Sequence, residues 1–138
     1  MINQYTVLTR SQEYSILTEN NTANVSLRIN QNIPLNSYIE FDMNYLDGST
    51  NSQFARWIQD NTAMTGIRLN QFNATVNTWY HVILKINQDG TVTCNMNDQT
   101  YIAPATNFDN TKKYIQFIFT TINENTEIRF KNLNIWTV

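Results

Sequence analysis

Hydrophobic residues alternate with polar residues in run after run of this 138-residue sequence. A two-residue period predicts β-strands with one face on a core and the other in water, because successive side chains of a strand point to opposite sides. The clearest runs are Val25–Ile29, Ile39–Tyr45, Val82–Ile86 and Ile115–Phe119. No segment shows a convincing amphipathic helix. The sequence therefore predicts an all-β chain.

Turn-forming residues separate these runs. They include Asp47-Gly48, Gln88–Gly90 and Asn123–Asn125, of which the second joins two strands as a tight hairpin. Roughly nine or ten short strands with hairpin connections favour a two-sheet antiparallel β-sandwich of the jelly-roll type. We expect residues 1–138 to form a single domain, which suits a chain of this length.

The apolar positions of the last run change phase along it. They are Ile128, Phe130, Leu133 and Ile135. The even and odd pairs can face one core only if an extra residue intervenes, so we predict a β-bulge near Lys131-Asn132. Beyond the bulge, Trp136 points away from the core.

Charge and composition exclude several classes of partner and chemistry. The net charge is −2 and the basic residues are scattered along the sequence, which argues against binding nucleic acid. No apolar run approaches the length of a membrane span, and no signal peptide is visible at the first residues. Cys94 is the only cysteine and lies in a strand pattern, so we expect a buried, inert thiol.

Three segments, taken in order, resemble the laminin-G-like and concanavalin-A-like lectin superfamily. They are Ser37–Met43, the hairpin that runs from Thr78 to Thr93, and the closing strand Ile128–Ile135. The chain departs from the family at Asn97–Gln99, where an Asp-Gly turn is usual. The resemblance implies a jelly roll that often binds carbohydrate, and small domains of this kind are common in virion appendages of bacterial and archaeal viruses.

One segment invites a catalytic interpretation. Glu40–Tyr45 resembles the Glu-x-Asp-x-x-Glu strand of laminarinase-type glycoside hydrolases, in which the two glutamates act as nucleophile and acid/base. Retaining hydrolysis needs two carboxylates. Here Tyr45 occupies the last position, on the opposite face from Glu40 by alternation. We therefore expect no enzyme, and leave a laminarinase-like hydrolase as a remote alternative.

His81 is the only histidine, so a histidine-rich metal site is impossible. We expect it to be a strand residue whose ring is partnered by a hydroxyl or a backbone group. No motif in the sequence indicates a cofactor. Loop residues Asp47, Asn51, Asp60 and Asp98 offer oxygen ligands for Ca²⁺, but no dense Asp-x-Asp spacing indicates a dedicated metal site, and a loop calcium site stays open. Trp79, two residues earlier, is interpreted as structural.

Polar and aromatic residues that fall out of phase with the core of their own strands are candidates for a binding surface. An aromatic ring packs on the C–H face of a sugar, and polar groups bond its hydroxyls. We predict a shallow carbohydrate-binding groove on one sheet, lined by Trp57, Arg68, Glu40, Asp42, Asn44 and Trp136.

These features predict a non-catalytic domain that recognises carbohydrate on a cell surface as part of a virion attachment protein. The alternative is a structural virion subunit of a capsid decoration, tail fibre or baseplate, which acts through protein–protein contacts and forms a homo-oligomer. Either function places the protein on the virion or outside the cell.

Overall fold

The computed structural model describes residues 5–10, 12–17, 25–46, 53–121 and 127–137, which form two antiparallel sheets. The seven-stranded sheet has the order β1 (Tyr5–Arg10), β12 (Glu127–Thr137), β5 (Ser37–Leu46), β8 (Trp79–Ile86), β9 (Val92–Met96) and β10 (Gln99–Ala103), with β2 (Tyr14–Leu17) also on β12. The five-stranded sheet has the order β3 (Val25–Arg28), β11 (Tyr114–Thr121), β6 (Gln53–Gln59) and β7 (Thr62–Arg68), with β4 (Ile33–Pro34) on β11.

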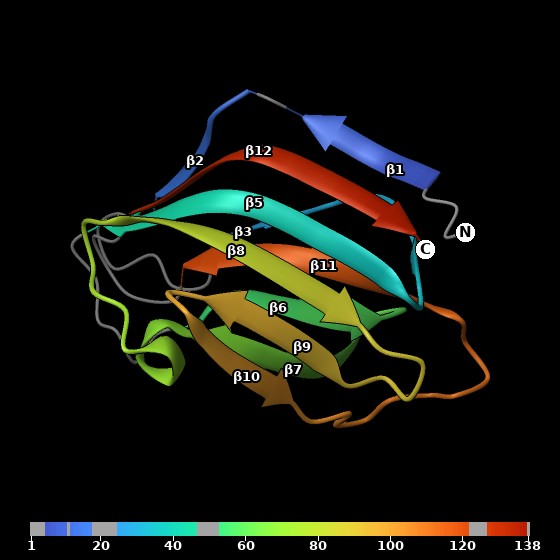
Figure 1. Ribbon diagram of the computed structural model, residues 1–138. Helices are drawn as coiled ribbons and strands as arrows, with labels where there is room; N and C mark the ends of the chain where they lie inside the picture. Colours follow the sequence, from blue (N-terminus) through green and yellow to red (C-terminus); the bar gives the residue numbers. More distant parts are fainter. Residues whose placement is uncertain (1–4, 11, 18–24, 47–52, 122–126, 138) are drawn as a thin grey trace.

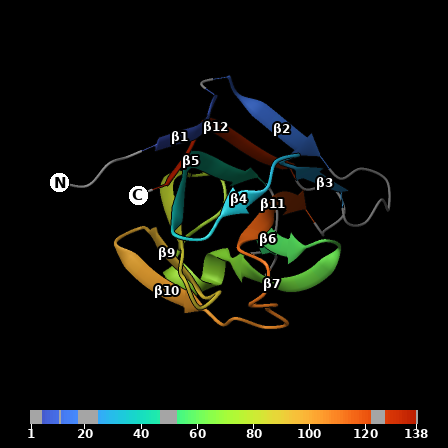
Figure 2. The same cartoon turned by 90° about the vertical axis from the view of Figure 1, so that its right-hand side faces the viewer.

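The all-β, two-sheet prediction is confirmed. In the described ranges the helical structure is one 3₁₀ turn, η1 (Leu69–Phe72). Figure 1 shows β12, β5 and β8 side by side in one layer, while β2 and β3, from different sheets, approach each other at one side of the sandwich in Figure 2. The predicted turns at Asp47-Gly48 and Asn123–Asn125 lie outside the described residues.

An aromatic cluster joins the two sheets. Phe119 of β11 stacks on Phe130 of β12 with ring centroids 3.8 Å apart, and it meets the ring of Phe41 in β5 edge-on at 4.9 Å. Phe117 meets Phe119 edge-on at 5.0 Å. All four rings are buried, so each sheet covers the apolar face of the other.

Side chains alternate strictly between the core and the outer face along β5 and β8. The odd-numbered residues of β5 from Ile39 to Tyr45 lie in the core, as do Val82, Leu84 and Ile86 of β8. Leu27 of β3 departs from the prediction. It lies on the core side, since it pairs with buried Phe119, yet it is 42% exposed because β3 is an edge strand.

The predicted bulge in β12 is confirmed. The pairing with β5 shifts register between Lys131 and Asn134, and Asn132 adopts a left-handed conformation with φ of 56°. Asparagine tolerates this conformation better than most residues. The bulge keeps Leu133 in the core and leaves Trp136 on the outer face.

The predicted orientation of Trp57 is wrong. Trp57 is 1% exposed and pairs with Phe117 in the core. The reason is that the β6–β7 pairing shifts register between Gln53 and Ala55, so that Phe54 and Trp57 both lie in the core, although alternation would place them on opposite faces. The indole therefore supplies core packing and no part of a binding surface.

The hairpin between β8 and β9 and the cysteine both match their predictions. Asn87 N–H donates to Thr91 O at 2.8 Å, and Gly90 has a φ of 85° that a residue with a side chain rarely adopts. Cys94 is buried, and this burial raises the pKa of its thiol.

Replacing Phe119 with alanine tests the aromatic cluster. The variant loses contacts to three rings and leaves a cavity between the sheets, so we expect a loss of about 3–5 kcal/mol in the free energy of unfolding. Urea denaturation measures it. The control is Thr106→Ala on an exposed loop, and an equal loss in both variants would contradict the role of Phe119.

Candidate functional site

The outer face of β12, β5 and β8, here called the polar face, carries most of the candidate groups. Register places Lys131, Asp42 and His81 in one row across the three strands, and Arg129, Asn44 and Trp79 in the next. These side chains lie out of phase with the core residues of their strands, as the sequence predicted for Glu40, Asp42 and Asn44.

His81 bridges two carboxylates on the polar face. Its Nε2 lies 2.6 Å from Glu40 Oε2, and its Nδ1 lies 2.7 Å from Asp42 Oδ1. Asn132 of the bulge donates from Nδ2 to the other Asp42 oxygen at 2.8 Å. We call Glu40, Asp42 and His81 the histidine clamp. The predicted hydroxyl or backbone partner for His81 is wrong, because cross-strand pairing brings carboxylates to both ring nitrogens.

The clamp favours the charged forms of His81 and Asp42. The hydrogen bond to Asp42 raises the pKa of His81 above its ordinary 6.5; burial acts against this, and the bond to Glu40 adds to it. Burial alone would raise the pKa of Asp42, but hydrogen bonds from His81 and Asn132 outweigh it and hold that pKa below 3.8. An imidazolium that donates to two carboxylates is the expected state at mildly acidic pH.

Trp79 is exposed beside the clamp. Its side chain is 40% exposed, and the ammonium of Lys131 lies 4.2 Å from its ring centre, a cation–π distance that fixes the indole. The sequence favoured a structural role for this tryptophan. The position was detectable, since Trp79 and His81 are both out of phase with Val82 and Leu84.

A shallow groove of about 520 Å³ runs from Trp79 and His81 to the β9–β10 hairpin, so it begins beside Glu40 and Asp42, which bond His81. We call it the β8–β10 groove. Its floor and walls include Trp79, His81, Ile83, Asn95, Asn97, Asp98, Gln99 and Thr100. Thr100 Oγ1 donates to Asn95 Oδ1 at 2.5 Å, so the wall from β9 and β10 is ordered by its own hydrogen bond. The sequence analysis missed this wall because short polar strands carry no distinctive motif.

Two other predicted site residues lie on the polar face but outside the groove. Trp136 stacks on Tyr38 with ring centroids 5.2 Å apart. Asn44 is only 9% exposed, because Trp79 and Arg129 flank it in register, and its Oδ1 has no hydrogen-bond partner among the described residues.

The prediction that all six candidate residues line a single groove is wrong. Arg68 belongs to β7 in the five-stranded sheet, whereas Glu40 belongs to β5 in the other sheet, and Trp57 lies in the core between them. Alternation along one strand cannot reveal which sheet that strand joins, so residues predicted for one face were drawn from three environments.

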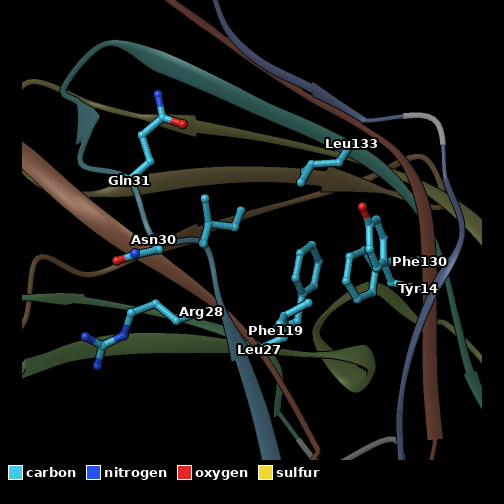
Figure 3. A pocket seen from close by; sticks show the side chains of 9 residues that line it. Tyr14, Leu27, Arg28, Asn30, Gln31, Phe119, Phe130 and Leu133 are labelled. Atoms are coloured by element: carbon cyan, nitrogen blue, oxygen red, sulfur yellow. The ribbon is translucent and has the colours of Figure 1, made fainter.

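A second cavity, of about 310 Å³, opens between the sheets where β2 meets β3. Figure 3 shows Tyr14 beside Phe130, and their rings stack 5.4 Å apart, with Phe119 and Leu27 facing the same space. We call it the edge cavity. Its lining combines apolar side chains with those of Arg28, Asn30 and Gln31.

No group of three or more His, Cys, Asp or Glu residues is arranged to hold a metal ion in the described ranges. Glu40, Asp42 and His81 form hydrogen bonds with one another. Within the same ranges no helix is long and apolar enough to cross a membrane.

Comparison with known proteins identifies the fold. No protein-family model and no curated protein match the chain. Among 51 solved chains that match, the binding domain of botulinum neurotoxin serotype D has 15% identity and a TM-score of 0.54, over 98% of this chain and 43% of that one. The ligand-binding domain of the same serotype in complex with N-acetylneuraminic acid has 14% identity and a TM-score of 0.53, over 96% and 47%.

The carbohydrate recognition domain of Emp46p, in its metal-free form, has 11% identity and a TM-score of 0.56, over 96% of this chain and 86% of that domain. This chain spans less than half the length of the neurotoxin domains it matches. The likeness shows that the chain shares the two-sheet β-sandwich fold of these domains.

Titration of His81 tests the clamp. Because the protein has a single histidine, its imidazole signals in NMR are unambiguous. We expect a pKa above 6.5 in the wild type, and Asp42→Asn lowers it toward 6.5 because the charged partner is lost. The control is Asp89→Asn, whose carboxylate bonds Thr91 instead. An unchanged titration in Asp42→Asn contradicts the clamp.

The same pair predicts the pH dependence of stability. A raised His81 pKa stabilises the fold fully below about pH 6.5 and ceases to do so as the pH rises through the folded-state value. The lowered Asp42 pKa stabilises it above about 3.8 and ceases to do so as the pH falls through its folded-state value. The stability that this pair contributes is therefore greatest between about pH 3.8 and pH 6.5. Thermal melts recorded across this pH range measure it.

Proposed function

We propose that the protein is a non-catalytic carbohydrate-binding domain whose ligand occupies the β8–β10 groove. The observation that carries the proposal is the exposed indole of Trp79 beside the histidine clamp, in a groove walled by amide and hydroxyl side chains. A sugar offers an apolar C–H face and a rim of hydroxyls, and this surface offers a matching partner for each.

Trp79 supplies the apolar partner. The contact with Lys131 orders the indole before a ligand arrives, so little side-chain freedom is lost on binding. A fixed aromatic ring with a large exposed area is the kind of residue that dominates binding energy at protein surfaces.

The clamp and the opposite wall supply the polar partners. Glu40 and Asp42 are acceptors with spare lone pairs, while the imidazole holds both carboxylates in place. Across the groove, Asn95 and Gln99 carry amides that both donate and accept. Because a hydroxyl is both a donor and an acceptor, this mixture suits a polyol better than an apolar or a purely anionic ligand.

The arrangement supports binding without catalysis. The position of the second catalytic glutamate in laminarinase-type enzymes is occupied by Tyr45, which is 1% exposed in the core, so that strand offers no such acid on the polar face. Asp42 is an acidic neighbour of Glu40, but both carboxylates bond the same imidazole. The similar structures named as carbohydrate- or receptor-binding domains support the same conclusion.

The setting we propose is the attachment of a virion to a cell-surface glycan. The glycan part is supported by the similarity to a neurotoxin binding domain, to such a domain in complex with N-acetylneuraminic acid, and to a carbohydrate recognition domain. The virion part rests on the resemblance of three sequence segments to domains that are common in virion appendages. The neighbouring genes test this setting. Capsid or tail genes beside the coding sequence are expected, and a neighbourhood without virion genes contradicts it.

Trp79→Ala tests the groove. On a glycan array and then by calorimetry with the best glycan, we expect an affinity loss of at least about tenfold, or about 1.4 kcal/mol. Trp136→Ala is the matched control, since that indole lies on the polar face outside the groove and should retain binding. If only Trp136→Ala loses glycan affinity, the binding site lies at Trp136 and not in the groove. If the wild type releases reducing sugar and Glu40→Gln does not, the protein is a hydrolase.

A second candidate function, a structural role in an oligomer, is favoured by Ile102. This residue is 60% exposed on β10, the edge strand of the seven-stranded sheet. An exposed apolar residue on a strand edge is typical of a protein contact. Light scattering after gel filtration should show an oligomer that Ile102→Lys dissociates, whereas a wild-type monomer at all concentrations would reject this function.

A further inference from the structure

Three arginines gather on the outer face of the five-stranded sheet, in the sheet opposite the histidine clamp. Arg28 of β3 and Arg56 of β6 pair with the same residue, Ile118 of β11, so the two arginines flank it in one row. Their Cα atoms are about 10 Å apart, since strands in a sheet are spaced 4.7–4.9 Å. Figure 3 shows Arg28 pointing away from the aromatic rings of the edge cavity.

Arg68 belongs to the same face. It pairs with Gln53, and the amide of Gln53 lies where a Cβ on Gly66 would point, only 2.6 Å from it. Gly66 in turn pairs with Arg56, so the side chains of Gln53, Arg56 and Arg68 share one side of the sheet. We call Arg28, Arg56 and Arg68 the arginine face.

No carboxylate neutralises the arginine face within the described residues, because none of their ion pairs includes one of the three arginines. Arg28 donates from both terminal nitrogens to the neutral Asn61 Oδ1, at 3.4 Å each. Asp60, next to Asn61, bonds Lys112 Nζ at 3.0 Å and Tyr114 instead. Positive charge therefore accumulates on this face of a chain whose net charge is negative.

Two buried polar atoms on the same face have no partner among the described residues. They are Nε of Arg56, a charged donor, and Oε1 of Gln116, an acceptor. Gln116 pairs with Ile58, two positions along β6 from Arg56, so the two side chains are diagonal neighbours. A buried donor and acceptor left unpaired are costly, and native proteins satisfy such groups with a ligand or water.

We propose that the arginine face binds an acidic saccharide through its carboxylate or sulfate groups. A guanidinium forms two parallel hydrogen bonds to a planar or tetrahedral oxyanion, and none of the three arginines pairs with a carboxylate among the residues that the structure describes. The amide of Gln116 lies beside Arg56 and donates from Nε2 to Asn32 Oδ1 at 3.1 Å, so an amide pair stands next to the oxyanion, where a sugar hydroxyl can bond it. A saccharide carries both groups within one ring, whereas an inorganic anion carries only the first.

This site is independent of the β8–β10 groove, because it lies on the other sheet. Arg28, Arg56 and Arg68 come from β3, β6 and β7, while the groove is formed by β8, β9 and β10. The protein would thus contact a glycan on two faces. The groove binds neutral hydroxyls, and the arginine face binds negatively charged groups.

The probe is a heparin-derived tetrasaccharide, which carries sulfates and carboxylates, and calorimetry on the full chain measures its affinity. Arg56→Gln and Arg68→Gln should each weaken binding by roughly tenfold or more, since each removes a charge-assisted pair. Arg129→Gln removes the same charge from the opposite sheet, where Arg129 contacts Glu127, and should bind as the wild type does. Prior saturation of the β8–β10 groove with its best neutral glycan should leave the affinity for the tetrasaccharide unchanged, which separates this result from a failure of the groove.

Two further measurements keep the proposal falsifiable even if an arginine variant folds poorly. In the wild type, the Nε–Hε resonance of Arg56 should shift on addition of the tetrasaccharide, and affinity should fall as salt rises. A desulfated tetrasaccharide distinguishes the two anions: retained binding identifies carboxylate recognition, and lost binding identifies sulfate recognition.

Three outcomes would overturn the proposal. Equal losses in Arg56→Gln and Arg129→Gln would show attraction to overall charge and no specific face. Binding of a neutral tetrasaccharide with the same affinity would remove the role of the oxyanion. Binding of a DNA duplex of matched charge as tightly as the saccharide would identify a surface for any polyanion.

Discussion

The contact between Phe119 and the rings of Phe41, Phe117 and Phe130 is the interaction on which the rest of the molecule depends. It joins β11 of one sheet to β5 and β12 of the other. Because alternate residues of a strand face opposite ways, pinning Phe41 and Phe130 inward places Glu40, Asp42 and Lys131 outward. The polar face is thus a geometric consequence of aromatic packing on the other side of the same strands.

The two outer faces of the sandwich carry opposite chemistry. The polar face joins an imidazole to two carboxylates beside an exposed indole, whereas the arginine face holds three guanidinium groups with amide neighbours. The net charge of −2 is a sum over the whole chain, so it does not indicate how charge is distributed between the two faces. A protein with this distribution can meet one extended ligand, or two different ones, on surfaces with different sensitivity to salt and pH.

Much of the fold followed from the sequence where the strands are regular. The alternation in β5, β8 and β11 correctly predicted which residues form the core, and the change of phase in β12 located its bulge. The same reasoning failed for Trp57, because a register shift between Gln53 and Ala55 interrupts the period of β6 and no residue type in the sequence marks it. It failed for His81 as well, because both of its partners lie about 40 residues away in the chain.

The sequence by itself determined the class of fold and the outward direction of Glu40, Asp42 and Trp136, because both depend only on the period of side chains along one strand. Only the tertiary structure decided which outward residues meet. Glu40, Asp42 and His81 form a clamp because β5 and β8 are neighbours, and Arg68 is separated from them because β7 belongs to the other sheet. Strand order is set by the packing of the whole chain, and no local pattern encodes it.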